Sequence, residues 1–395
     1  MIDAKEIKKA VMDHREEIIR CLVEMVQTPS VTGDEVPVSR VFRRWMEEMG
    51  LEVKTYEAEP GRPNLLAEWF GPEKGPRFIF NGHMDVFPPV ESDPGMYGPW
   101  SGKVTDGKIY GRGTGDMKGG DCAAIMAVKI LKELGFEPKG SILLSFMCDE
   151  ENGSRLGAKY LIDKELLNGD FGICMEPTDC EILTHHGGIY RAYYTYTAEG
   201  YHSHAPHPCG SAIDKVHRAI DAVLELAEEI NRRPNPLYDP PCLSVTTVHA
   251  GTATNLHASK ATFSVDRRYI KGETIESVQK EIADVLDRLK EQDPGMEYEV
   301  EVQSDRPTLT VPEDSKMVTT MEKAWEEVMG RPAKFRYCQG GTDAASIVKH
   351  NGMHMVVCGP TDGLVMAGNA NECVEIKDLL SMVELYALTA MRMLS

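Results

Sequence analysis

The sequence lacks a long hydrophobic run, a surplus of basic residues and closely spaced cysteines. Within its 395 residues no apolar stretch approaches the roughly 18–20 residues that a membrane-spanning helix needs. Lysine and arginine number 43 and aspartate and glutamate 62, which gives a net charge of −19 with histidine neutral. Such an acidic chain is poorly suited to bind the nucleic-acid backbone or anionic lipid. We therefore expect neither a nucleic acid nor a membrane as a partner.

The ten cysteines are scattered from Cys21 to Cys373, and no C-x-x-C pair occurs among them. The N-terminal stretch is charged from Asp3 onward and lacks the apolar core of a signal peptide. These features favour a cytoplasmic location, where thiols stay reduced. Any metal ion is then expected to be held by histidine and carboxylates rather than by a cysteine cluster.

Apolar strands alternate with helices along the first part of the chain. Strands are expected at residues 51–56, 64–69, 77–81, 140–147 and 171–175, and a long helix at 119–134. This alternation predicts an α/β fold with a mainly parallel sheet flanked by helices.

The pattern changes near residue 188. Strands at 190–197, 243–250, 261–268 and 297–303 alternate with helices at 212–231 and 275–292 in a β-α-β-β-α-β order, the ferredoxin-like pattern. From about residue 306 the α/β alternation of the first part of the chain resumes. We predict an α/β domain over 1–187 plus 305–395, with an inserted ferredoxin-like α+β domain over 188–304.

Three of the predicted strands run into ionisable residues at their C-terminal ends. The first leads to His83 and Asp85, the second to Glu150 and Glu151, and the third to Glu176. Open α/β sheets bind ligands beyond the carboxyl ends of their strands. Carboxylates gathered there raise one another's pKa unless a cation holds them. A metal site at this edge of the sheet is the economical interpretation.

Each of these residues also has an ordinary structural interpretation. A His83-x-Asp85 pair can lie on the surface, adjacent glutamates usually face solvent, and Asp116 before Met-Lys-Gly-Gly can cap a helix. On an extended segment Glu150 and Glu151 would face opposite ways, which suits one general base and one metal ligand. Asp85 would either orient His83 or bind metal itself. Their joint occurrence at the ends of successive strands favours the metal site.

Five motifs then occur in a fixed order along the chain: Asn81-Gly-His-Met-Asp85, Gly111-Arg-Gly-Thr-Gly-Asp-Met-Lys-Gly119, Asp149-Glu-Glu-Asn152, Glu176-Pro-Thr178 and Gly340-Gly-Thr-Asp343. Together they resemble the family of co-catalytic metallohydrolases that contains acetylornithine deacetylase, succinyl-diaminopimelate desuccinylase, aminoacylase and carboxypeptidase G. The resemblance runs from about residue 15 to the C-terminus. It implies metal-dependent amide hydrolysis and makes the inserted domain a lid and dimerisation domain.

The resemblance implies that His83, Asp116 and Glu176 bind one metal ion. Asp116 would bridge to a second ion, held by Glu151. One or two divalent ions per chain are therefore expected. The ligand set fits Zn²⁺, Co²⁺ or Mn²⁺, and we take Zn²⁺ first.

The same resemblance implies that Glu150 is the general base and that Asp85 is the partner of His83. In the inserted domain, ungapped alignment of His202-Ser-His-Ala-Pro206 with the family's H-x-x-x-P element selects His202. This histidine would complete the site of the partner subunit in a homodimer and help to stabilise the tetrahedral oxyanion. His204 fits the element only with a deletion.

Asn255 and Arg268 match family positions that bind a substrate carboxylate, and Gly341 belongs to the Gly340-Gly-Thr-Asp343 motif that we place at the substrate. The arginine fork suits a carboxylate. Without the resemblance, a turn asparagine and a strand-end ion pair are the preferred interpretations of Asn255 and Arg268.

One position departs from the family pattern. The family ends its site with a histidine in an A-H-x-x-N-E segment, whereas this chain reads Ala367-Gly-Asn-Ala-Asn-Glu372 and has Gly368 in place of the ligand. Three outcomes are open: a weakly bound second metal, a substitute ligand, or an enzyme that works with one metal.

The expected function is hydrolysis of the amide bond in N-acyl amino acids or small peptides, by a water that the metal activates and Glu150 deprotonates. A dipeptidase or aminopeptidase is the alternative within the enzymes. Because Gly368 replaces a ligand, the alternative to an enzyme is a catalytically impaired binding protein.

Overall fold

The computed structural model describes residues 2–90, 92, 95–204, 210–362 and 368–395. Two compact units share the chain. Unit 1 comprises Met1–Thr184, Val311–Arg336 and Thr342–Ser395, and unit 2 comprises His185–Thr310 and Tyr337–Gly341. The role of the inserted residues 188–304 as a lid and dimerisation domain stays a prediction.

A nine-stranded sheet has most of its strands in unit 1, and its four central strands are parallel. In spatial order these are β6 (Lys139–Met147), β3 (Glu73–His83), β7 (Phe171–Cys174) and β15 (His354–Val357). Beyond β6 the sheet continues with β2 (Pro63–Phe70), antiparallel to β6, and β1 (Val53–Glu57), antiparallel to β2. Beyond β15 lies β8 (Ile182–His186), antiparallel to β15 and paired with the antiparallel strand β13 (Leu309–Thr310). Strand β14 (Phe335–Cys338) also pairs with β8 and runs in the same direction.

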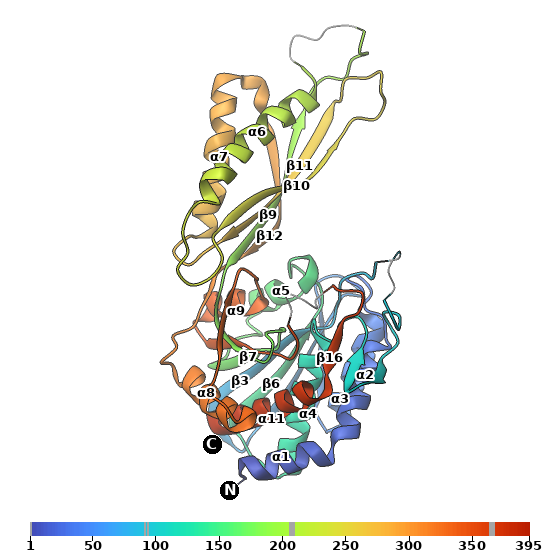
Figure 1. Cartoon of the computed structure of the whole chain (residues 1–395), viewed down its shortest axis with the longest axis vertical. Helices are drawn as coiled ribbons and strands as arrows, with labels where there is room; N and C mark the ends of the chain where they lie inside the picture. Colours follow the sequence, from blue (N-terminus) through green and yellow to red (C-terminus); the bar gives the residue numbers. More distant parts are fainter. Residues whose placement is uncertain (1, 91, 93–94, 205–209, 363–367) are drawn as a thin grey trace. The chain divides into compact units, whose positions relative to one another are not determined.

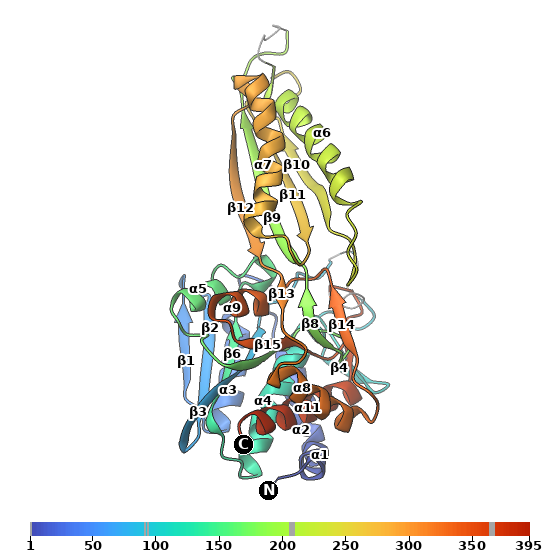
Figure 2. The same cartoon turned by 90° about the vertical axis from the view of Figure 1, so that its left-hand side faces the viewer.

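Helices flank this sheet in two groups (Figures 1 and 2). One group packs around α4 and consists of α1 (Ala4–Asp13), α2 (Arg15–Val26), α3 (Val36–Glu48), α4 (Lys118–Glu133), α8 (Lys316–Met329) and α11 (Ile376–Met393). The other is the pair α5 (Ala158–Asp163) and α9 (Asp343–Asn351). Helix α4 is apolar on nearly every side, and its residues from Lys118 to Val128 are buried. The predicted fold class, a mainly parallel sheet flanked by helices with an inserted α+β domain, is confirmed.

Unit 2 contains a four-stranded antiparallel sheet in the order β10-β11-β9-β12. Its elements follow the chain as β9 (Gly188–Thr197), α6 (Ala212–Ile230), β10 (Cys242–Ala250), β11 (Lys260–Tyr269), α7 (Ile275–Gln292), the short turn η2 (Pro294–Met296) and β12 (Tyr298–Arg306). Alternate residues of β9, among them Tyr190, Tyr194 and Tyr196, lie in one hydrophobic core with α6 and α7. Ser211 and Thr274 begin the two helices with capping boxes.

A small three-stranded sheet was not expected from the sequence. Its strands β4 (Lys103–Thr105), β5 (Lys108–Tyr110) and β16 (Cys373–Glu375) have three residues each. The pairing of β16 with β5 places the residues before β16 next to the glycine-rich loop at 111–116. No described helix combines the length and apolar character that crossing a bilayer requires.

Candidate metal centre

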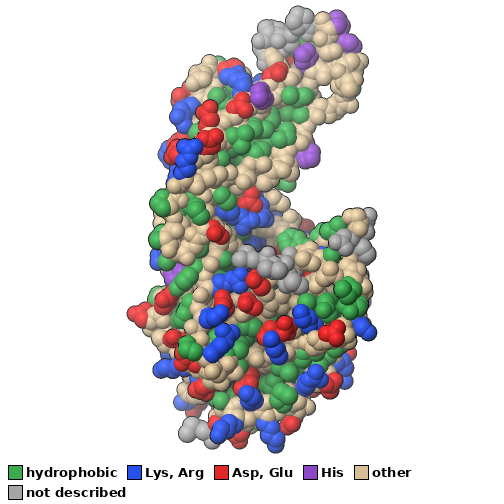
Figure 3. All heavy atoms as spheres, viewed as in Figure 1, with side chains coloured by type: hydrophobic (Ala, Val, Ile, Leu, Met, Phe, Trp, Pro, Cys, Tyr) green, Lys and Arg blue, Asp and Glu red, His purple; other side chains and the backbone are tan. Residues whose placement is uncertain are grey.

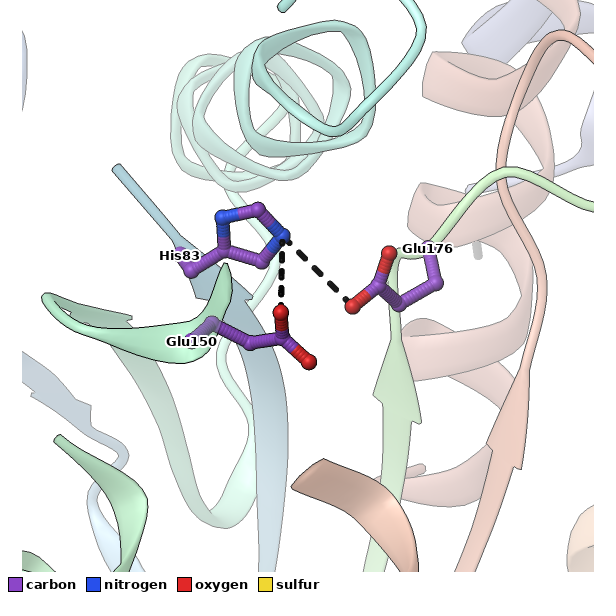
Figure 4. Close-up of side chains that lie close together, drawn as sticks. All are labelled: His83, Glu150 and Glu176. Carbon is purple, nitrogen blue, oxygen red and sulfur yellow. Dashed lines mark ion pairs between the residues drawn. The ribbon is translucent and has the colours of Figure 1, made fainter. Parts of the chain in front are cut away.

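Three neighbouring parallel strands deliver ionisable side chains to one edge of the sheet. His83 ends β3, Glu150 and Glu151 lie in the short turn η1 (Glu150–Asn152) after β6, and Glu176 follows β7. Figure 4 shows Glu150 and Glu176 directed toward Nε2 of His83. Oε2 of Glu150 lies 3.9 Å from this nitrogen, and Oε1 of Glu176 lies 3.6 Å from it.

Asp116 joins this cluster from the loop before α4. Its Oδ1 lies 3.2 Å from Nε2 of His83. Two sets of atoms each lie within 4.8 Å of one another, His83 with Glu150 and Glu176, and His83 with Asp116 and Glu151. The structure therefore brings together the four predicted metal ligands and, with them, the predicted general base Glu150.

Buried atoms without partners show what the cluster can accommodate. His83 Nε2, Asp116 Oδ1 and Glu151 Oε1 are buried and have no hydrogen-bond partner among the described residues. A buried polar atom without a partner costs about 1–3 kcal/mol, so such atoms are rare unless a ligand or ion satisfies them. One imidazole and several carboxylates form a donor set that suits zinc, cobalt or manganese. The residues present fit a divalent cation.

The protonation equilibria lead to the same conclusion. Burial, reinforced by the charge of Asp116, raises the pKa of Glu151 and of Glu176 well above its usual range. Burial lowers the pKa of His83, but the neighbouring carboxylates outweigh it and raise that pKa well above its usual value. Without a cation the cluster retains protons, and a divalent ion would displace them.

The carboxylate of Asp85 positions the turn that carries both glutamates. Oδ1 accepts a hydrogen bond from the main-chain N–H of Glu150 at 3.1 Å, and Oδ2 accepts from that of Glu151 at 3.3 Å. Nδ1 of His83 lies 2.9 Å from the main-chain oxygen of Asp85 and 3.6 Å from its Oδ1. A carbonyl oxygen only accepts, so Nδ1 carries a proton and the lone pair of Nε2 can face a metal.

Glu150 and Glu151 do not lie on an extended segment, the case in which they would face opposite ways. They form a 3₁₀ turn after Asp149, which has a φ of 67°. The physical reason is Asp85, because one carboxylate can accept from two successive amides only where the chain turns. The turn directs both glutamates into the cluster instead of to opposite sides.

The position of Gly368 is fixed beside the loop that carries Asp116. Nη2 of Arg112 donates to the main-chain oxygen of Gly368 at 3.0 Å. Gly368 has a φ of +74°, and an added Cβ would meet no atom within 4 Å. Ala367, the first residue of this motif, lies outside the described residues. Glycine offers no side-chain ligand at this position.

The remaining predicted site residues belong to unit 2. Nδ2 of Asn255 lies 3.4 Å from Nε2 of His202, and Nδ1 of His204 lies 2.6 Å from Nδ1 of His202. All three side chains are exposed. The two candidate lid histidines are therefore hydrogen-bonded to each other, while Pro206 of their motif lies outside the described residues.

Arg268 forms the strand-end ion pair that its position in the sequence allows. Its Nε donates to Oδ1 of Asp266 at 2.7 Å, and its Nη1 donates to the main-chain oxygen of Gln339 at 3.4 Å. Gly341 accepts a hydrogen bond from Nη1 of Arg306 at 3.0 Å. Within unit 2, these contacts join β11 and β12 to the segment Tyr337–Gly341.

Sequence reasoning missed two buried charged residues near the cluster. Nζ of Lys118 donates to the main-chain oxygens of Met25 and Thr28, at 2.9 and 3.1 Å, and burial lowers the pKa of Lys118 to about 7. Burial raises the pKa of Asp121 well above its usual range, and neither of its carboxyl oxygens has a hydrogen-bond partner among the described residues. Charged residues inside an otherwise apolar helix were the signal that could have identified both.

Comparisons with known proteins agree with this geometry. The model of the family described as Peptidase family M20/M25/M40 matches residues 79–392. A succinyl-diaminopimelate desuccinylase of Rhodospirillum centenum is 29% identical over 376 residues, covering 92% of this chain and 94% of the relative. A succinyl-diaminopimelate desuccinylase of Marinobacter nauticus is 27% identical over 372 residues, covering 92% of this chain and 95% of the relative. An M20 metallo-carboxypeptidase of Sulfolobus solfataricus shares the fold, with a TM-score of 0.77, 18% identity and coverage of 95% and 98%.

Proposed function

Because this chain belongs to peptidase family M20/M25/M40, we propose that it cleaves the amide bond of N-acyl amino acids or small peptides. The family and its desuccinylase relatives make the chain a metallohydrolase of amide or peptide bonds. One observation carries the proposal: a buried histidine and four carboxylates converge at the ends of β3, β6 and β7, and several of their buried atoms have no partner among the described residues.

We assign His83, Asp116, Glu151 and Glu176 as the metal ligands. They would hold one or two divalent ions, with Zn²⁺ as the first choice and Co²⁺ or Mn²⁺ as alternatives. A divalent ion supplies Lewis acidity, which polarises a carbonyl group and acidifies water. The chain's own contribution is to hold the ligands ready, since Asp85 fixes the turn of Glu151 and the proton of His83.

We assign Glu150 as the general base. Its carboxylate faces the cluster, and its main-chain N–H is held by Asp85. In hydrolysis it would accept a proton from the attacking water and deliver that proton to the leaving amine nitrogen as the C–N bond breaks. This assignment accounts for an acidic group that the four ligands do not require.

The residues of unit 2 are proposed to bind the substrate. His202 would donate a hydrogen bond to the developing oxyanion. Asn255, Arg268 and Gly341 would contact the substrate carboxylate. Hydrogen bonds to Asp266 and Gln339 use three of the five N–H donors of Arg268, so within the described structure two remain for a substrate carboxylate.

We further propose that unit 2 pairs with a second copy of the chain. In the described sheet β10 is an edge strand, with β11 as its neighbour. Helix α6 exposes Ile213 and Leu224, at 48% and 47%, and Val248 of β10 is 53% exposed. The two helical residues fall on one face, and Figure 3 shows hydrophobic side chains gathered over α6. An open edge beside an apolar helix face suits an isologous two-fold contact.

Metal analysis and a substrate panel test the proposed function. The purified chain is dialysed, its metal content is measured, and it is assayed with Zn²⁺, Co²⁺ or Mn²⁺ against N-acetyl and N-succinyl amino acids and dipeptides. We expect hydrolysis that a chelator abolishes and that added metal restores. Failure to cleave any member of the panel with metal bound would refute the proposed substrate class. Cell fractionation tests the predicted cytoplasmic location.

A further inference from the structure

The two carboxylate oxygens of Glu372 have separate partners. Glu372 precedes β16 and is 1% exposed. Its Oε1 accepts hydrogen bonds from the main-chain N–H groups of Gly115 and Asp116, at 2.9 and 3.1 Å. Its Oε2 accepts from Nη1 of Arg112 at 2.9 Å. All three donors lie in the loop that presents Asp116 to His83.

Arg112 extends this network to the C-terminal segment. Arg112 is 4% exposed, and its Nη2 donates to the main-chain oxygen of Gly368. The main-chain N–H of Gly111 also donates to the main-chain oxygen of Glu372, at 2.9 Å. Two loops about 260 residues apart in sequence are thus held together as one hydrogen-bonded assembly.

Burying an ionised carboxylate costs free energy unless hydrogen-bond donors replace the lost water. For Glu372 these donors belong to the Asp116 loop. Burial raises the pKa of Glu372, while the hydrogen bonds from the loop amides oppose that rise. Hydrogen bonds to an ionised group are about twice as strong as neutral ones. The main-chain N–H of Asp116 is one of these donors, so the bond acts directly on the residue whose Oδ1 lies 3.2 Å from Nε2 of His83.

We propose that Glu372 is a positioning residue for the metal centre. It fixes the backbone of Asp116 so that this carboxylate is held ready to bind metal, and Arg112 couples the segment at Gly368 to the same loop. This inference rests on the proposed function, since it takes Asp116 as a metal ligand. With glycine at 368, the geometry of Asp116 is expected to carry a larger share of the affinity at the ion it contacts.

Titration with Co²⁺ alone tests this role, using the full-length chain and the variants Glu372→Ala and Glu372→Gln. Glutamine keeps the shape, but its NH₂ group must face either the loop amides or the guanidinium, and all of these are donors. We expect both variants to bind Co²⁺ about 10–100-fold more weakly, the range for loss of a residue that orients a ligand. The visible spectrum of bound Co²⁺ should change as well.

Glu384→Gln is the matched control, because Glu384 is a second buried carboxylate of unit 1, on α11, and no described hydrogen bond joins it to the Asp116 loop. It should bind Co²⁺ as the wild type does. If the wild type binds no Co²⁺, the proposed function fails. If the wild type binds and a folded Glu372 variant matches it in affinity and spectrum, the positioning role is wrong. Circular dichroism shows whether each variant is folded. If Glu372→Ala does not fold, the Co²⁺ affinity and spectrum of Glu372→Gln test the positioning role.

Discussion

The residues proposed as metal ligands and general base and the residues of unit 2 proposed to contact the substrate lie in opposite surroundings. In unit 1, His83 is 1% and Glu150 5% exposed, and Asp85 and Glu372 hold the loops around them by their backbone amides. In unit 2, His202 lies exposed between β9 and α6, and Asn255 lies exposed between β10 and β11. A buried, supported cluster can hold several like charges in fixed geometry, whereas exposed polar groups can adapt to a ligand. The proposed ligands and base are thus held rigidly in unit 1, whereas the groups proposed to contact the substrate in unit 2 remain adaptable.

The largest expected effect is the loss of the general base. Glu150→Gln removes the proton acceptor while keeping the side-chain shape, so activity should fall by about 10²–10⁴-fold. Metal content measured after dialysis should stay at the wild-type value, and Glu52→Gln, an exposed carboxylate of unit 1, should leave both unchanged. Loss of metal together with activity would instead make Glu150 a ligand, as its distance to His83 allows.

A second substitution restores the histidine that the family pattern has at position 368. Gly368→His should strengthen binding of the more weakly bound metal ion at least tenfold, about 1.4 kcal/mol. The reason is that an imidazole would join a site with few protein ligands. Metal titration of wild type and variant measures it. Gly330→His is the control, because Gly330 has a φ of +66° and equally open surroundings. This variant measures the effect of placing histidine at a positive φ, without adding a ligand at position 368. Two tightly bound ions in the wild type would contradict the premise.

The pairing surface of unit 2 should be sensitive to charge. Leu224→Glu places a carboxylate on the exposed face of α6, and we expect it to weaken the dimer about tenfold or more. Sedimentation over a range of concentrations measures the dissociation constant. Leu237→Glu, at a position 43% exposed between α6 and β10, serves as control. A wild-type chain that stays monomeric at high concentration would refute the pairing.

The smallest expected signal comes from mixing two inactive variants. If His202 acts in the site of the partner subunit, Glu150→Gln mixed with His202→Ala should recover about a quarter of wild-type activity, since half of random dimers are hybrids with one complete site. His204→Ala in place of His202→Ala distinguishes the two histidines. No recovery after confirmed subunit exchange would mean that the site is not shared.

Strand patterning was enough to predict where His83 and Glu176 would lie, because parallel apolar strands end at one edge. It could not predict the role of Glu372, whose partners lie about 260 residues away in a loop without periodicity. The turn at Glu150 also escaped prediction, since it depends on the side chain of Asp85 rather than on local propensity. The strands β4, β5 and β16 are too short to give a periodic signal.

The discontinuity of unit 1 has a consequence for biosynthesis. Strands β3, β6 and β7 leave the ribosome before unit 2, whereas β15, Glu372 and α11 follow it. The core of unit 2 lies within one stretch, so we expect it to fold while the first unit still lacks the strand between β7 and β8. The Asp116 loop acquires its support from Glu372 only when the end of the chain has emerged. Full metal affinity is then expected only after the segment that carries Glu372 has been synthesised.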